Sequence, residues 1–215
     1  ITDMTPWRRR LLDAVSPLDS GVSGLQVSGY RPPDSDTYRP SRTAAVLVPI
    51  LDLPEPELVL TRRAEHLAQH PGQVSFPGGA AEEDDGSAVQ TALREAQEEI
   101  GLPPESAEPI GFLDRMDTIS DYRVLPVVAL VSGPVEWSPD HREVAEVFTV
   151  PVSVALDRHR YQGRAVSRDG QSYTIWSLDW EGYNIWGATA AMLMNLITRL
   201  EHSVEPENTG IRSGT

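Results

Sequence analysis

The sequence predicts an α+β fold, a mixed α/β sandwich in which helices cover a β-sheet. Runs with strand composition and helix-like apolar periods follow one another without the regular alternation of a parallel α/β protein. Hydrophobic residues make up 40% of the 215 residues, which excludes a globally disordered chain. A chain of this length buries roughly 70–75% of its unfolded surface, so we expect one compact domain with additions at its ends.

The N-terminal part is expected to form a short helix and an irregular segment. Pro6 is typical of a first helical position, and the helical pattern runs to Val15. Residues 16–42 are rich in Ser, Pro, Gly and Asp and show no sustained period. The predicted organisation is a helix and irregular wrap over 1–42, the main domain over 43–202 and a flexible tail over 203–215.

The main domain carries the expected strands, in β-rich runs bounded by turn residues. The predicted strands are Ala44–Ile50, Glu57–Thr61, Pro109–Leu113, Val124–Val131, Val144–Val150, Tyr161–Val166 and Tyr173–Asp179. The first two and the last two should form hairpins. Helices are predicted over Ser87–Gly101, Val152–Asp157 and Ile185–Glu201, and the last is apolar nearly all round, which predicts burial.

Composition excludes several functional classes. The formal net charge is −14, which argues against a nucleic-acid partner because such binding needs a positive surface. Every basic residue is Arg and Cys is absent, so a P-loop lysine, a lysine Schiff base and cysteine-based sites are excluded. No apolar run approaches the ~20 residues of a membrane span, and no targeting segment is visible. We therefore expect a cytoplasmic protein without a membrane partner.

One predicted helix gathers carboxylates on a single stripe. At about 100° per residue, Glu98 and Glu99 fall within about 60° of Glu95 on either side. Like charges at this spacing repel, and Mg²⁺ and Mn²⁺ prefer carboxylate oxygens, so the stripe is a candidate metal platform. A solvated acidic helix face is the alternative. The glycines Gly78 and Gly79, just upstream, permit close approach of the backbone to a ligand.

The segment Gly79–Leu102 resembles the Nudix box, G-x5-E-x7-R-E-U-x-E-E-x-G-U with U aliphatic. Its second half matches throughout from Arg94 to Leu102, with Ala96 at the small aliphatic position. Its first half is one residue longer, so the first Glu position falls at Asp85 or Gly86. The resemblance implies a Nudix-type α/β/α sandwich with a central mixed sheet. It also implies a hydrolase that uses Mg²⁺ or Mn²⁺ to cleave a pyrophosphate bond.

A second resemblance narrows the substrate. Residues 58–79, ending in Phe76-Pro77-Gly78-Gly79, resemble the signature L-L-T-x-R-S-x3-R-x3-G-x3-F-P-G-G of coenzyme A pyrophosphatases. Residues 143–148 and 184–190 also look like that branch. The implied reaction converts coenzyme A to 3′,5′-ADP and 4′-phosphopantetheine. The alternatives are another nucleoside diphosphate derivative, such as ADP-ribose or NADH, and a non-catalytic nucleotide-binding module. Family analogy also implies a homodimer.

The resemblance assigns roles to individual residues. It implies metal ligation by Glu95, Glu98 and Glu99, with a backbone carbonyl at Gly78 or Gly79. Glu95, Glu98 and Arg94 are the expected catalytic residues, with Arg94 fixing the acids through ion pairs or, alternatively, contacting phosphate.

Substrate binding is expected from Arg62, whose guanidinium suits phosphate, together with Gly78 and Arg123. The acid that orients or deprotonates the attacking water is left open. The candidates for it are Glu98, Glu143 and Glu146.

Overall fold

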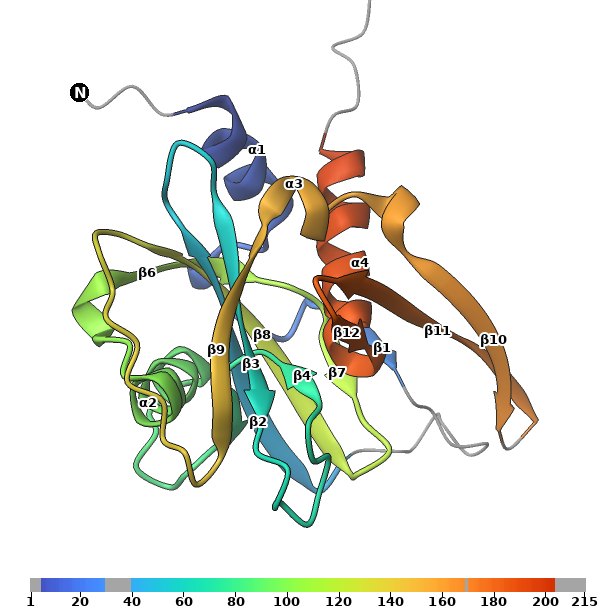
Figure 1. Ribbon diagram of the computed structural model, residues 1–215. Helices are drawn as coiled ribbons and strands as arrows, with labels where there is room; N and C mark the ends of the chain where they lie inside the picture. The colour runs from blue at the N-terminus through green and yellow to red at the C-terminus, as the bar shows by residue number, and fades with distance from the viewer. Residues whose placement is uncertain (1–4, 30–39, 169, 204–215) are drawn as a thin grey trace, which may run out of the picture.

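The computed structural model describes residues 5–29, 40–168 and 170–203 (Figure 1). Its helices are α1 (Pro6–Ala14), α2 (Ala88–Ile100), α3 (Val152–Ala155) and α4 (Gly187–His202), with 3₁₀ turns at Leu18–Ser20, Pro104–Ser106 and Arg158–Arg160. The larger sheet contains β1 (Val27–Gly29), β2 (Arg42–Leu51), β3 (Glu57–Arg63), β4 (Val74–Ser75), β5 (Gly78–Ala80), β6 (Ala107–Phe112), β7 (Arg115–Asp117), β8 (Tyr122–Val131) and β9 (Val144–Pro151). The smaller sheet contains β10 (Gln162–Arg168), β11 (Gln171–Trp180) and β12 (Tyr183–Trp186).

The larger sheet is mixed and is centred on the pair β2–β8. These two strands run parallel in register from Arg42 with Tyr122 to Leu51 with Val131. The sheet order is β1-β7-β8-β2-β3-β4, while β9 lies antiparallel on β3 and β6 antiparallel on β8. One edge of β2 is shared, because β5 pairs with its first half and β3 with its last two residues. This mixed topology confirms the predicted fold class.

Apolar side chains alternate between the two faces of the sheet and form two cores. One core packs β2, β3 and β8 against α1 and α4, through buried residues such as Leu11, Leu60 and Leu193. The other packs the same sheet against α2, whose Ala96 and Ile100 are fully buried. Helices therefore cover both faces, with α2 on one side of the sheet and α1 and α4 on the other (Figure 1).

Most predicted elements are confirmed, and the differences have local causes. The last helix begins at Gly187 and not at Ile185, because Tyr183–Trp186 forms β12 and Gly187 has a φ of 65° that interrupts the apolar run. The hairpin of β2 and β3 forms, but β3 pairs mainly with β9, which local sequence patterns do not indicate. The short strands β1, β4, β5 and β7 were not predicted.

The division into a wrap over 1–42, a main domain over 43–202 and a tail stays a prediction. The strand β2 begins at Arg42 and α4 ends at His202, while the predicted tail lies outside the described residues except for Ser203. The helix α1 is packed into the core through Leu11 and is not a detached extension. Across the described ranges, no helix has both the length and the apolar character that crossing a membrane would require.

Candidate active site

The helix α2 carries the acidic stripe and is fixed at both ends. At its start, the Ser87 hydroxyl accepts a hydrogen bond from the Gln90 N–H, 3.2 Å away. At its end, Gly101 adopts a left-handed conformation with φ 71°, and its N–H bonds to helix carbonyls. Because one face is held against the sheet by Ala92 and Ala96, the acids face the glycine loop, residues 76–80.

Glu99 lies between the helix and the glycine loop. Its residue is only 6% exposed, and its Oε2 accepts a hydrogen bond from the Gly78 N–H at 3.1 Å. Burial raises the pKa of Glu99 to about 8, since the charged form loses its hydration. A carboxylate in this setting is favoured in its charged form when a cation lies beside it.

Gly79 and Glu95 are in direct contact. A Cβ atom on Gly79 would lie 2.5 Å from Oε1 of Glu95, so only glycine leaves room for this carboxylate. Glu95 is half-buried, and its burial raises its pKa. The loop backbone and the carboxylates of Glu95 and Glu99 therefore lie in contact with one another.

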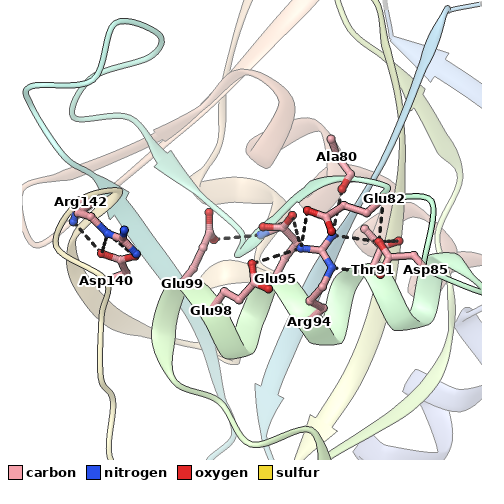
Figure 2. Close-up of polar contacts among 11 residues, drawn as sticks. Ala80, Glu82, Asp85, Thr91, Arg94, Glu95, Glu98, Glu99, Asp140 and Arg142 are labelled. Atoms are coloured by element: carbon pink, nitrogen blue, oxygen red, sulfur yellow. Dashed lines mark hydrogen bonds and ion pairs between the residues drawn. The ribbon is translucent and has the colours of Figure 1, made fainter.

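Arg94 binds the acids around it (Figure 2). Its Nη1 donates to Oε1 of Glu95 at 3.0 Å and to Oε2 of Glu98 at 3.2 Å. Its Nη2 donates to Asp85 at 2.9 Å and to the Ala80 carbonyl at 3.1 Å, and its Nε donates to Asp85 at 3.1 Å. With its donors used in this way, Arg94 fits the ion-pair role and not the alternative phosphate contact.

Asp85 takes the position that the sequence left open between Asp85 and Gly86. Its carboxylate also accepts from the Glu82 N–H and the Thr91 hydroxyl, each at 2.9 Å, and its side chain is 8% exposed. The hydrogen bond from Arg94 lowers its pKa well below the usual range. Compared with the Nudix box, the loop is one residue longer and its acid is Asp instead of the longer Glu. Together these two differences place the Asp85 carboxylate in contact with Arg94.

Replacing Asp85 should loosen the site. In Asp85→Asn the amide keeps the size of the side chain but loses the charge that holds Arg94. We expect kcat to fall about tenfold or more and the melting temperature to decrease, measured by turnover and calorimetry. The matched control is Asp84→Asn at the exposed neighbour, which should leave both unchanged. Equal effects at the two positions would contradict the anchoring role.

The donor set fits a hard divalent cation. Glu95 and Glu99 supply carboxylate oxygens one helical turn apart beside the glycine loop, and carboxylate oxygens are the ligands that Mg²⁺ and Mn²⁺ prefer. Glu98 stands apart, because its side chain is 60% exposed and turned to Arg94. In the ranges that the structure describes, no three Asp, Glu or His side chains are already grouped closely enough to hold an ion. The expected three-acid cluster is therefore only partly assembled.

The two downstream acids differ in their surroundings. Burial, and to a smaller extent the negative charge of Glu143, raises the pKa of both Glu95 and Glu99. Glu146 is engaged elsewhere, because its Oε1 accepts from the Tyr183 hydroxyl at 2.7 Å. This contact argues against Glu146 as the water-orienting acid, and the choice between Glu98 and Glu143 stays open.

The two arginines expected to bind substrate are engaged in ion pairs. Arg62 contacts Oε2 of Glu146 at 3.3 Å and Glu65 at 3.4 Å. Arg123 makes two hydrogen bonds of 2.7 Å to the buried Asp117. The structure brings neither of them to the acids of α2, so their role in substrate binding stays a prediction.

A different arginine, Arg63, was not chosen from the sequence. It follows Arg62 in β3, so its side chain points to the opposite face of the sheet, the face covered by α2. Counted back from Gly72 and Phe76, the Arg of the quoted signature falls on Arg63, and Ala64 stands at its Ser position. The signature therefore aligns its arginine with Arg63, while a role in substrate binding stays a prediction for Arg62.

Comparisons with known proteins show which family this chain resembles in sequence. The model of the NUDIX domain matches residues 41–169. Two relatives, each named "Uncharacterized Nudix hydrolase NudL", come from Salmonella paratyphi B and Salmonella heidelberg; each is 40% identical over 183 residues, which is 85% of this chain and 94% of the relative. Among solved structures, the MutT protein from Methanosarcina mazei Go1 is 17% identical, with a TM-score of 0.48, over 77% of this chain and 96% of that one.

Proposed function

Because this chain belongs to the Nudix hydrolase family, we propose that it hydrolyses the pyrophosphate bond of coenzyme A or its derivatives, using Mg²⁺ or Mn²⁺. The contact of Glu95 and Glu99 with the glycine loop is the observation that carries the hydrolytic part. The substrate rests on the signature over residues 58–79, since the names of the relatives specify no substrate.

The reaction adds water across the diphosphate. A new P–O bond forms between water and one phosphorus, the bridging P–O bond breaks, and two phosphate monoesters result. For coenzyme A these are 3′,5′-ADP and 4′-phosphopantetheine. When bound, the divalent cation would polarise water and neutralise charge on the phosphate oxygens.

The side chains then have distinct tasks. Glu95 and Glu99 hold the cation, and Gly79 leaves the space that Glu95 needs. Arg94 and Asp85 fix the orientation of Glu95 by ion pairing. We favour Glu143 over Glu98 as the acid that takes a proton from water, because Glu98 is turned to Arg94.

The setting that we propose is a cytoplasmic enzyme acting on a small molecule, as a homodimer by family analogy. The retained rival substrates are ADP-ribose and NADH. A non-catalytic nucleotide-binding module is disfavoured, because burying Glu99 is unfavourable without a cation to bind.

A substrate panel tests the proposal. The purified protein is incubated with coenzyme A, acyl-coenzyme A, ADP-ribose and NADH, with and without Mg²⁺ or Mn²⁺, and the products are identified. We expect coenzyme A or its acyl derivative to give the highest kcat/KM, and no turnover with a chelator. Equal or faster turnover of ADP-ribose would overturn the substrate, and the absence of all turnover would favour the non-catalytic module.

A further inference from the structure

We infer that Arg63 binds a non-bridging oxygen of the substrate's diphosphate and is the cationic contact of the protein with that group. This inference rests on the proposed hydrolysis of a diphosphate, but it does not depend on which diphosphate ester is the natural substrate.

The first observation is that the guanidinium of Arg63 meets no hydrogen-bond or ion-pair partner within the part of the chain that the structure describes. Its Nε is buried, and among the described residues no hydrogen bond or ion pair reaches this side chain. Buried N–H groups are almost always hydrogen-bonded, so an unpaired one calls for a ligand. The Nε atoms of Arg115 and Arg199 are also buried and unpaired, but the terminal nitrogens of both residues bind carbonyl or carboxylate oxygens.

The second observation is the direction that β3 gives to this residue. Successive side chains of a strand point to opposite faces of the sheet. In the pairing of β3 with β9, Arg62 lies opposite Glu146 and Arg63 opposite Val144, so the extra residue of this bulge belongs to β9. The strand β3 has no inserted residue there, and its side chains keep alternating between the two faces. Arg62 contacts Glu146 on one face, and Arg63 therefore lies on the face covered by α2.

The third observation is the charge on the face of the sheet where Arg63 lies. The helix α2 covers this face and carries Glu95 and Glu99. A diphosphate that approaches these carboxylates in a chain of net charge −14 is repelled unless cations face it. Arg94 is already bound to Asp85, Glu95 and Glu98, which leaves Arg63, among the described arginines on this face, with unpaired donors.

The chemistry of the guanidinium suits this task. It is permanently charged and presents several N–H donors in a plane that matches two phosphate oxygens. It transfers no proton here, so Arg63 is a substrate-contacting residue and not an acid–base group.

The test compares Arg63→Gln and Arg63→Lys with the control Arg9→Gln, which removes the same charge at an exposed residue of α1. For Arg63→Gln we expect kcat/KM to fall at least about tenfold with the diphosphate ester that the wild type hydrolyses fastest. The inhibition constant of inorganic pyrophosphate should rise by a similar factor. Arg63→Lys should recover only part of the loss because it keeps the charge but not the planar donors. Arg9→Gln should stay within about threefold of wild type.

A second measurement separates substrate binding from a role in structure or in the metal site. The Mn²⁺ affinity of each variant, followed by electron paramagnetic resonance, should not weaken in Arg63→Gln, and its melting temperature should stay close to that of wild type. A loss of Mn²⁺ affinity that accounts for the lost activity would overturn the inference. So would an equal or larger loss of kcat/KM in Arg9→Gln. If the wild type has its highest kcat/KM with ADP-ribose, and Arg63→Gln loses kcat/KM with ADP-ribose as well, the proposed substrate is wrong and this inference stands.

Discussion

Glu99→Gln is expected to lower kcat at least ~100-fold, equivalent to about 2.7 kcal/mol of activation free energy, while the protein stays folded. The amide lacks the negative charge that a divalent cation needs. Its carbonyl oxygen can still accept the hydrogen bond from the Gly78 N–H, so the contact between helix and loop survives. Steady-state turnover with saturating Mg²⁺ measures the loss, and circular dichroism checks the fold.

The control for this variant is Glu83→Gln, which changes the net charge equally at an exposed residue of the loop before α2. It should keep wild-type activity. Glu98→Gln then separates two roles. If kcat of Glu98→Gln falls as far as that of Glu99→Gln, Glu98 binds the cation or activates the attacking water. If kcat falls less than about tenfold, Glu143 remains the candidate that accepts the proton from water. Full activity in both Glu98→Gln and Glu99→Gln would place the chemistry elsewhere.

The two glycines of the loop should fail in different ways when each is replaced by alanine. In Gly79→Ala the new Cβ would meet the end of a side chain, the Glu95 carboxylate at 2.5 Å, which can turn away. We expect kcat to fall about 100-fold, with a change in unfolding free energy within about 1 kcal/mol. In Gly78→Ala the Cβ would lie 2.5 Å from the Ala45 carbonyl oxygen, which belongs to the central strand β2.

Gly78→Ala should therefore destabilise the fold by about 3 kcal/mol, because the backbone of β2 cannot move aside without loss of its pairing with β8. Urea denaturation measures both variants, and turnover is measured well below each melting temperature. Gly133→Ala, at a position with open space around it, tests the general cost of alanine at a glycine of positive φ. An active Gly79→Ala protein would show that Glu95 does not need its observed position.

Much of the fold was predictable because local patterns set it. The helix α2 matched within a residue at each end, since Ser87 and Gly101 are strong cap signals. The pairing of β3 with β9 was not predictable, because it joins segments far apart in the sequence and depends on the whole sheet. The strands β4 and β5 are two and three residues long, too short for any periodic signal.

The positions of the acids on one helix were predictable, but their contacts were not. Helical spacing placed Glu95, Glu98 and Glu99 on one stripe, yet it could not show that Arg94 binds Glu98 at the surface while Glu99 is buried. The arginines of β3 show a second difficulty. Neighbouring positions of a strand point to opposite faces of the sheet, so a choice between Arg62 and Arg63 is also a choice of face, which the sequence alone does not settle.

The glycine loop and the acids that face it are close neighbours along the chain. The hydrogen bond from Gly78 to Glu99 spans 21 residues, and the one from Arg94 to Asp85 spans nine. The strands that support them, β2 and β8, begin at Arg42 and Tyr122. Closing a short loop costs less conformational entropy than closing a long one, and contacts of short range form sooner during folding. Contacts within residues 78–99 are therefore short in range, and we expect them to form before the pairing of β2 with β8 is complete.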